Sequence, residues 1–365
     1  MDLIYQILQK GINLEASDIH LVPGQLPVYR VNRKLFFDES KLILSGEMLT
    51  SLVEFFCNQT PGLKEEIDSK RQADFSYGYG GHRFRINVAM TQCNPAFSIR
   101  IIPNGDIKVD DMGLAPVLQK LRKIDSGLIL ITGKVNSGKS TTMNAFIQEV
   151  NKVSNKKIVT LEDPIEYVHE SNKSIIIQRE VGAASDVLSY YDGLINLLRE
   201  DADIAVVGEI RDRKTMDVAL DLAESGGLVI GTLHTRSCGE TLDRILNLYD
   251  PADQVTVKNT VSSVLKIVIS QKLVVSTEDK LLMVPEIMVV NSSIAAHIRQ
   301  EKFNISDIED AIHSQRESGS ISFELSFVDL YLKGLVDMQT IKDNIDPNRL
   351  DVVKSNIINS GGKID

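Results

Sequence analysis

Residues 133–141 read GKVNSGKST and fit the spacing GxxxxGK[ST] of a phosphate-binding loop. Successive backbone N–H groups in such a loop, with the positive end of the helix that follows it, bind phosphate oxygens. Lys139 would reach the β- and γ-phosphates of a nucleotide, and the hydroxyl of Ser140 would ligate Mg²⁺. The apolar run GLILITG precedes the loop and a helix is expected from about 141 to 153, which is the context that the motif requires. The pattern predicts ATP and Mg²⁺ as ligands.

Two letters of this loop are unusual, because Lys134 and Asn136 stand where small or glycine residues would be comfortable. Asparagine tolerates the left-handed backbone conformation better than most residues. A lysine side chain is long enough to reach solvent, and its charge does not repel an anion. We expect the nucleotide contacts to come from Gly133, Asn136, Ser137, Gly138, Lys139, Ser140 and Thr141.

A second apolar run, DIAVVGE at 203–209, ends in an acid and has the form of a Walker B segment. Glu209 would hold Mg²⁺ directly or through water, or would position the attacking water. The alternative interpretation is a buried strand that ends in a surface glutamate. The neighbouring phosphate loop favours the Mg²⁺ role.

A third run ends in LEDPIE at 161–166. Pro164 prevents continuation as a helix and sets a turn, which places the acidic side chains near one rim of the sheet. Ligands of such sheets bind at the carboxyl ends of the strands. A carboxylate there could orient and deprotonate the water that attacks the γ-phosphate.

One histidine and three arginines complete the candidate residues. His234, in GTLHT, ends a further strand and could sense the γ-phosphate, although a structural role is the commoner one for such a histidine. Arg83 and Arg85 alternate along one strand and therefore share a face. With Arg100 they could offer guanidinium donors to phosphates across a domain or subunit boundary, and solvated strand charges are the alternative.

Apolar strands alternating with amphipathic helices after residue 127 indicate an α/β fold with a parallel sheet covered on both faces. The first hundred residues mix short elements: a helix expected to stop at Gly11, a strand over 28–37 and a hairpin over 73–90 that turns at Gly80-Gly81. The segment after about 294 is expected to be mainly helical.

The composition limits the function classes. The 365 residues carry a net charge of −10, which argues against a nucleic-acid partner, since a nucleic-acid surface needs a basic excess. No run reaches the roughly 18–20 apolar residues of a membrane span, and the first residues lack the features of a secretory signal. The cysteines Cys57, Cys93 and Cys238 are scattered without metal-ligand spacing, which suits a reducing cytoplasm.

Taken in order, several segments resemble motor ATPases of the type II and type IV secretion superfamily, most closely the retraction ATPases of twitching motility. The likeness runs from the first residues to about 340. The segments that carry it are ASDIHL, RFRIN, GKVNSGKSTT, LEDPIEYVHE, QREVG, LREDADIAVVGEIRD, AESGGLVIGTLHT and KGLV.

The resemblance implies a domain organisation and an assembly. A small PAS-like α+β domain would be followed by a RecA-like P-loop NTPase domain and a helical C-terminal segment. The expected limits are 1–104 for the first domain, 105–113 for a linker, 114–293 for the ATPase core and 294–365 for the helical segment and tail. The resemblance also implies a homohexamer that is peripheral to the membrane, at its cytoplasmic face, with an inner-membrane pilus platform protein as partner.

The resemblance also assigns roles to residues. Glu166 matches the catalytic glutamate of the aspartate box, Glu209 the acid near Mg²⁺, and His234 the histidine box. The residues that match the phosphate-reaching arginines of the family are Arg83, Arg85 and Arg100.

The function implied is ATP hydrolysis that drives retraction and disassembly of a type IV pilus. A four-cysteine zinc insertion is usual in assembly motors after the segment matching 269–274, and its absence here favours retraction. Two alternatives stay open: a pilus-assembly or type II secretion motor of the same superfamily, and a nucleotide-binding regulator with little hydrolysis.

Overall fold

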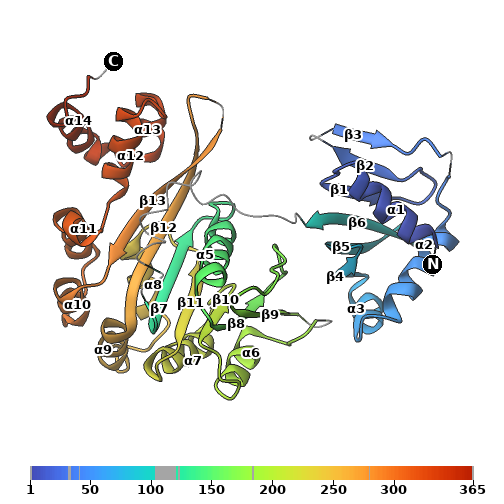
Figure 1. Cartoon of the computed structure of the whole chain (residues 1–365), viewed down its shortest axis with the longest axis horizontal. Coiled ribbons are helices and arrows are strands. Elements are labelled where there is room, and N and C mark those ends of the chain that lie inside the picture. The colour runs from blue at the N-terminus through green and yellow to red at the C-terminus, as the bar shows by residue number, and fades with distance from the viewer. Residues whose placement is uncertain are drawn as a thin grey trace. The chain divides into compact units, whose positions relative to one another are not determined.

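A computed structural model gives the fold (Figure 1). It describes residues 2–31, 34–40, 42–102, 121, 124–182, 185–278 and 280–363. The chain divides into two compact units, which are described separately. The first contains 1–105, 161–170 and 178–193, and the second contains 106–160, 171–177 and 194–365.

The first hundred residues form one antiparallel sheet with three helices. The sheet has the strand order β3-β2-β1-β6-β5-β4, and each neighbouring pair is antiparallel. The elements are α1 (Asp2–Asn13), β1 (Asp18–Leu21), β2 (Val28–Val31), β3 (Lys34–Phe37), α2 (Gly46–Cys57), α3 (Leu63–Lys70), β4 (Gln72–Tyr79), β5 (His82–Thr91) and β6 (Asn94–Ile102).

One face of this sheet is apolar and the other is polar. Alternate residues of β1, β5 and β6 pack against α1, α2 and α3 in a single core that includes Phe56, Phe84 and Phe97. The intervening residues point to the opposite face, where Asp18, Arg85 and Arg100 lie. The sheet therefore presents charged side chains on the face that its helices leave uncovered.

Two expectations for this region need correction. The run over 28–37 forms two short antiparallel strands, β2 and β3, instead of one. The first helix continues past Gly11 to Asn13. A Cβ atom at Gly11 would lie 2.6 Å from Cδ1 of Ile19, so this glycine allows α1 to pack closely on β1 and does not end the helix. The hairpin turn at Gly80-Gly81 is confirmed, with φ values of +59° and +76°.

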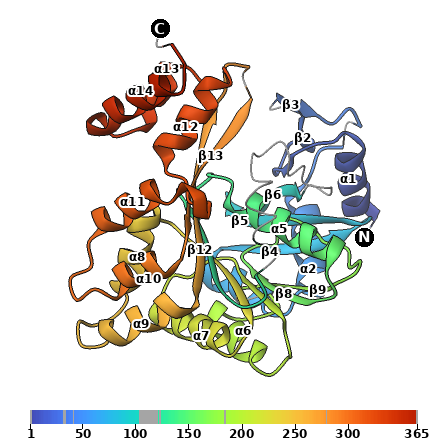
Figure 2. The same ribbon diagram turned by 60° about the vertical axis from the view of Figure 1, so that its left-hand side comes forward.

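The rest of the chain forms a seven-stranded sheet, its helices and a C-terminal helical segment (Figure 2). The elements are β7 (Gly127–Gly133), α5 (Lys139–Val153), β8 (Lys157–Glu162), β9 (Ile175–Glu180), α6 (Tyr190–Leu197), β10 (Ile204–Val207), α7 (Arg213–Glu224), β11 (Leu228–Leu233), α8 (Cys238–Leu246), α9 (Gln254–Val264), β12 (Leu265–Val275), β13 (Leu281–Val289), α10 (Ser292–Arg299), α11 (Ile305–Ser314), η2 (Arg316–Ser318), α12 (Phe323–Leu332), α13 (Met338–Asn344), η3 (Pro347–Arg349) and α14 (Leu350–Asn359).

The large sheet is mixed, with the order β13-β12-β7-β11-β10-β8-β9. Strands β12, β7, β11 and β10 are parallel, and every residue of β7 is buried, as expected for a central strand covered on both faces. The prediction of a parallel sheet is wrong at one edge, because β13 returns antiparallel to β12 in a hairpin. That hairpin was missed because its two strands follow each other without an intervening helix.

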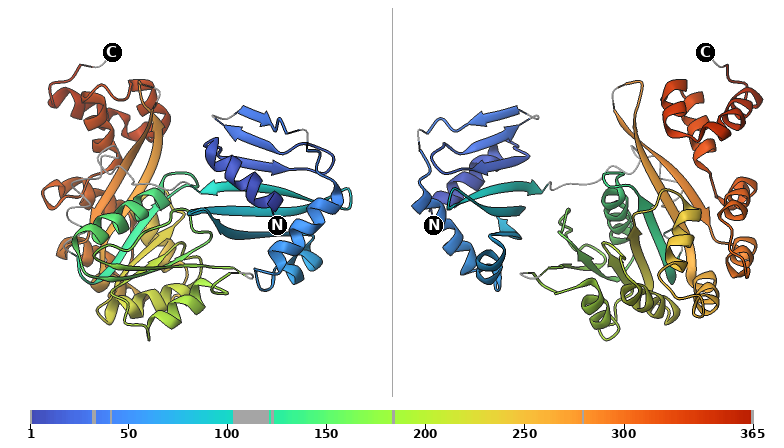
Figure 3. Two further views of the ribbon diagram at one scale, coloured as in Figure 1. Left: turned by 45° about the vertical axis from the view of Figure 1, so that its right-hand side comes forward. Right: turned by 180° about the vertical axis from the view of Figure 1, so that it is seen from behind.

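The C-terminal helices pack on this hairpin. Val274 of β12 and Val284 of β13 share a buried cluster with Phe327 of α12, Ile341 of α13 and Ile357 of α14. Helices α10 and α11 lie beside α9 and α8 (Figure 2), and the views in Figure 3 show the long β12–β13 hairpin reaching α12–α14. The helical character expected after 294 is confirmed.

The expected linker at 105–113 lies outside the described residues, and the domain limits given above stay predictions. In the part of the chain that the structure describes, no helix is both long and apolar enough to cross a membrane.

Candidate nucleotide-binding site

The candidate site of the second unit lies where parallel strands end. Strand β7 leads into the loop at Gly133, β10 is followed by Glu209, and β11 is followed by His234. Apart from the buried threonines Thr132 and Thr232, the residues of these strands are apolar or glycine, so the ionisable groups appear only after the last strand residue. Since β10, β11 and β7 are adjacent and parallel, the three segments meet at one edge of the sheet.

The loop has the backbone conformation that phosphate binding requires. Gly133, Asn136 and Gly138 have φ values of +149°, +63° and +88°. Asn136 therefore adopts the left-handed conformation that its residue type was expected to tolerate. Gly138 is the N-cap residue of α5, so the first amides of that helix face the loop.

The interior of the loop is tight. A Cβ atom at Gly133 would lie 2.3 Å from Oγ of Ser137 and 2.6 Å from the carbonyl oxygen of Gln271. The Ser137 hydroxyl is buried and has no hydrogen-bond partner among the residues that the structure describes. A buried hydroxyl without a partner is costly. A phosphate oxygen in the loop would give it one, so the residues present fit a nucleotide phosphate.

Lys139 is folded onto the loop. Its ammonium donates to the carbonyl oxygens of Gly133 and Lys134, each at 3.0 Å, and lies 3.3 Å from Nδ1 of His234. The side chain is 9% exposed. A phosphate would offer stronger, charged acceptors at the same place, so this lysine is already aimed at the cradle.

Glu209 and His234 form the polar edge next to that lysine. Nε2 of His234 lies 3.2 Å from Oε1 of Glu209, and Arg211 lies 2.6 Å from Oε2. Burial alone would raise the pKa of Glu209, but the hydrogen bond and charge of Arg211, together with the hydrogen bond of His234, outweigh it and lower the pKa. An ionised carboxylate is the form that can ligate Mg²⁺.

The segment with Glu166 belongs to the first unit. Glu166 is exposed and makes no hydrogen bond or ion pair with any residue that the structure describes. The segment itself is held by Gln178 of β9, which donates to Oε1 of Glu162 at 3.0 Å and to the carbonyl of Tyr167 at 2.7 Å. Gln178 also accepts from the N–H of His169. Glu166 therefore lies on a loop whose neighbouring residues are held in place by Gln178.

The three arginines differ in their surroundings. Arg83 is in an ion pair with Glu180 at 2.6 Å within the first unit. Arg85 and Arg100 are direct cross-strand partners on β5 and β6, and they lie 3.9 Å from Asp74 and 3.3 Å from Asp18, respectively. Like charges opposite each other destabilise a sheet, which makes an anionic partner for this pair favourable.

Three residues with clear structural roles had no assigned role in the sequence. Gln178 holds the segment of Glu166 through hydrogen bonds, and Arg211 stabilises the ionised form of Glu209. Gln271 lies next to the phosphate loop, where its Nε2 donates to Oγ1 of Thr142 at 2.9 Å. The only signal for Arg211 was its position two residues after the acid. Gln271 had none, because it belongs to the strand pair that was missed.

These features define the class: a P-loop nucleotide-binding protein with a mixed α/β sheet and a separate α+β unit. The family described as "Type II/IV secretion system protein" matches residues 1–300, and the chain belongs to that family. The chain is 32% identical to the "Type IV pilus retractation ATPase PilT" of Pseudomonas aeruginosa over 93% of its length and 97% of the relative. It is 33% identical to a "Twitching motility protein" of Neisseria gonorrhoeae, with 85% and 82% covered.

Solved structures agree with this assignment. A crystal structure of the pilus retraction motor PilT with bound ADP has a TM-score of 0.83 at 33% identity, covering 95% of this chain and 98% of that one. The ATPase DotB of Legionella pneumophila has a TM-score of 0.80 at 23% identity, covering 99% and 96%. The second likeness concerns the fold alone. The expected fold, a small N-terminal domain followed by a P-loop NTPase domain, is confirmed.

Proposed function

We propose that this protein is an ATP-hydrolysing motor that drives retraction of a type IV pilus. The observation that carries the proposal is the 32% identity to a retraction ATPase, which extends over 93% of the chain and nearly all of the relative. The loop geometry supports it, because the phosphate cradle is complete and Lys139 is aimed into it.

The residues that would bind the nucleotide are those of the loop and its helix. The amides that follow Gly133 and Gly138 would donate to phosphate oxygens, and Lys139 would move from the loop carbonyls to the β- and γ-phosphates. The full set in this role is Gly133, Asn136, Ser137, Gly138, Lys139, Ser140 and Thr141.

Ser140 and Glu209 would hold Mg²⁺, since a hydroxyl and an ionised carboxylate are the oxygen ligands that Mg²⁺ prefers. The ion, when bound, would neutralise charge on the phosphates. His234 would exchange its contact with Lys139 for one with the terminal phosphate. Glu166 would orient the attacking water and accept its proton, as an exposed carboxylate that is unpaired among the described residues is able to do.

Charge on the leaving phosphate would be stabilised from outside the loop. Arg85 and Arg100 offer exposed guanidinium groups from adjacent strands, and Arg83 is a further candidate. Within a ring of six copies, the N-terminal domain of one copy would reach the nucleotide of another. We propose this homohexamer together with the domain limits 1–104, 114–293 and 294–365.

The proposed place of work is the cytoplasmic face of the membrane. There the ring would act peripherally on an inner-membrane pilus platform protein, without nucleic acid. ATP hydrolysis would change the relative position of the domains, and that movement would be transmitted to the platform.

The proposal is tested by deleting the gene and by assaying the purified chain. Cells without a retraction motor retain surface pili that fail to shorten, whereas cells without an assembly motor have no pili. Phosphate release by the purified chain in the presence of Mg²⁺ separates a motor from a regulator that binds nucleotide without hydrolysis. Absence of pili after deletion, or no phosphate release, would overturn the proposal.

A further inference from the structure

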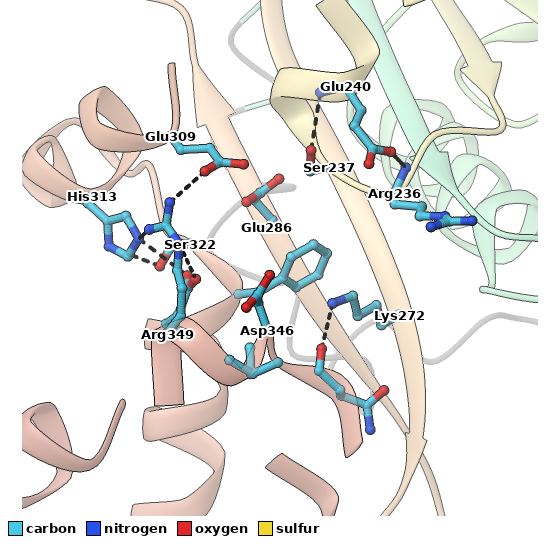
Figure 4. Close-up of a pocket in the computed structure, with 14 residues that line it drawn as sticks. Arg236, Ser237, Glu240, Lys272, Glu286, Glu309, His313, Ser322, Asp346 and Arg349 are labelled. Carbon is cyan, nitrogen blue, oxygen red and sulfur yellow. Dashed lines mark hydrogen bonds and ion pairs between the residues drawn. The ribbon is translucent and has the colours of Figure 1, made fainter. Parts of the chain in front are cut away.

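A polar cavity of about 240 Å³, separate from the phosphate loop, lies in the second unit between the large sheet and the C-terminal helices (Figure 4). Its volume is below the roughly 300–1,000 Å³ of pockets for drug-sized ligands, so it suits a group the size of a side chain. The lining residues are Arg236, Ser237, Glu240, Lys272, Glu286, Glu309, His313, Ser322, Phe323, Glu324, Asn344, Ile345, Asp346 and Arg349.

Part of this lining is a closed ion-pair network. Arg349 of η3 lies 2.6 Å from Glu309 and 3.7 Å from Glu324, and His313 lies 3.3 Å from Glu324. Ser322 completes the network, with its hydroxyl 3.3 Å from Nδ1 of His313. Each of these groups is paired with another member of the network, so none of them is offered to a ligand.

Glu286 of β13 is the exception. It is 6% exposed, and one carboxylate oxygen accepts from the N–H of Cys238 at 2.6 Å. No lysine, arginine or histidine of the described residues lies within 4 Å of this carboxylate, and its hydrogen bonds among them come from Cys238, through the backbone N–H and the thiol. Burial, with the charges of Glu324 and Glu309, outweighs these hydrogen bonds and raises the pKa of Glu286 to about 7. A buried carboxylate without a cation is costly.

The cations of the lining do not contact this carboxylate, and Lys272 feels the charge of Glu286 only from beyond contact distance. The ammonium of Lys272 lies 4.1 Å from the centre of the Phe323 ring and donates to the carbonyl of Asn344 at 2.9 Å. Arg236 is exposed. Figure 4 shows the Lys272 bond and the Arg349 pair as dashed lines, while Glu286 has none to the other residues drawn.

We propose that this cavity binds a primary ammonium group, either that of a lysine side chain from a partner protein or that of a short free diamine. The ammonium would pair with the carboxylate of Glu286, which has no cation in contact with it among the described residues. The carboxylates of Glu240 and Asp346 line the same cavity and face no basic side chain within 4 Å among the described residues. They would supply the remaining acceptors for the three N–H bonds of the group.

Two short chain segments connect the cavity to the phosphate loop. The coupling between the two sites that we infer from them rests on the proposed function. Ser237, the N-cap residue of α8, lies three residues after His234, and its hydroxyl accepts from the N–H of Glu240. On β12, Lys272 faces the cavity while its neighbour Gln271 bonds to Thr142 beneath the phosphate loop. Occupation of the cavity would therefore shift the positions of two parts of the nucleotide site, the segment of His234 and the base of the phosphate loop.

The test is isothermal titration calorimetry of the full chain at pH 8 with 1,5-diaminopentane and with N-acetyl-lysine amide, at constant ionic strength. Saturable one-to-one binding supports the proposal. Binding of the diamine alone indicates a free diamine as ligand, and binding of the lysine amide indicates a partner's side chain. No saturable binding of either probe would overturn the proposal.

The pH dependence of binding is the second readout, because it reports the charge on Glu286. Binding is expected to be about tenfold weaker at pH 6 than at pH 8, because a carboxyl with a pKa near 7 is then mostly protonated. At pH 6, where this carboxyl is mostly protonated, protons should be released on binding, which is measured there in two buffers of different ionisation enthalpy. This readout needs no variant, and binding that is independent of pH, without proton release, contradicts the proposal.

Variants locate the site. Glu286→Gln keeps the acceptor for Cys238 and removes the charge, so ammonium binding should fall below detection. Glu278→Gln is the control, because Glu278 is an exposed carboxylate at the β12–β13 turn, outside the cavity. Equal binding by Glu286→Gln and the unchanged chain would refute the site.

The coupling between the cavity and the nucleotide site is measured from the effect of each ligand on the affinity of the other. ADP and the ammonium probe should change each other's dissociation constant by the same factor, about fivefold or more. Equal probe affinity with and without ADP would refute the link alone. Failure of ADP to bind at all would instead refute the proposed function, so the two failures are distinguishable.

Discussion

The ammonium of Lys139 lies 3.3 Å from Nδ1 of His234, and Nε2 of the same ring lies 3.2 Å from Glu209. An ammonium has only N–H bonds to donate, so Nδ1 must be the acceptor. The proton of a neutral ring then sits on Nε2 and points at the carboxylate. One histidine therefore connects the phosphate lysine to the candidate Mg²⁺ acid.

This connection predicts the effect of His234→Ala. Turnover should fall roughly 100-fold, the cost typical of removing one group that stabilises a developing charge, while ADP affinity stays within about threefold. Phosphate release and a fluorescent ADP titration measure the two quantities. His297→Ala, which removes a partly exposed histidine on α10, serves as control and should leave both unchanged. A loss of ADP affinity equal to the loss of turnover would contradict this role.

The strands of the large sheet were predictable where they alternate with helices. Runs such as GLILITG and GGLVIGTLHT are entirely apolar before their polar ends, because central parallel strands are buried on both faces. The β12–β13 hairpin does not follow that rule, so its register and the position of Gln271 could not be inferred. The glycine at 11 was misread for another reason: whether a helical glycine ends the helix or permits close packing depends on its neighbour, here Ile19.

The candidate site was predictable in its chemistry and not in its contacts. Spacing and residue type identified Lys139, Glu209 and His234, and strand order explains why they meet. The roles of Gln178 and Arg211 depend on which groups their side chains contact in the folded chain, and residue type alone does not specify those contacts. The cavity around Glu286 is lined by residues from seven elements spread between 236 and 349, so no local sequence pattern could predict it.

Glu166→Gln should separate binding from hydrolysis. The amide keeps the size of the side chain and cannot accept a proton from water, so turnover should fall at least roughly 100-fold. ADP affinity should not change, since the phosphate cradle is formed by other residues. Glu170→Gln, a second exposed glutamate in the same segment, is the matched control for phosphate release. Undiminished turnover in Glu166→Gln would remove Glu166 from the proposed mechanism.

The backbone at Asn136 predicts which substitutions the loop tolerates. With φ at +63°, Asn136→Gly should retain nucleotide affinity, whereas Asn136→Ala keeps a Cβ atom in the left-handed region without the short polar side chain that lets asparagine adopt it, at a cost of about 1 kcal/mol. That cost corresponds to roughly fivefold weaker ADP binding. The two dissociation constants, measured side by side, test the conformation. Equal affinities for the glycine and alanine variants would show that the bound loop does not need this φ.

The His313–Glu324 pair predicts how stability depends on pH. The hydrogen bond and charge of Glu324 raise the pKa of His313, against burial and the charge of Arg349. Since the folded pKa is the higher one, the stabilisation is complete below about pH 6.5 and is lost as the pH rises through the folded value. For Glu324, burial opposes ionisation, but His313, Ser322 and its own backbone amide lower the pKa to about 2. Its contribution is therefore lost between about pH 4.5 and 2.

His313→Gln isolates the alkaline part of this dependence. The difference in thermal midpoint between the unchanged chain and the variant should be largest near pH 6 and should shrink toward pH 9, because only the protonated imidazole attracts Glu324. Glu286 also destabilises the fold as the pH rises, but mainly between about 4.5 and 7, and it is present in both chains. Differential scanning fluorimetry at half-unit steps gives the curves, with His297→Gln as the control. A difference that is constant from pH 6 to 9 would show that the pair does not titrate in the folded protein.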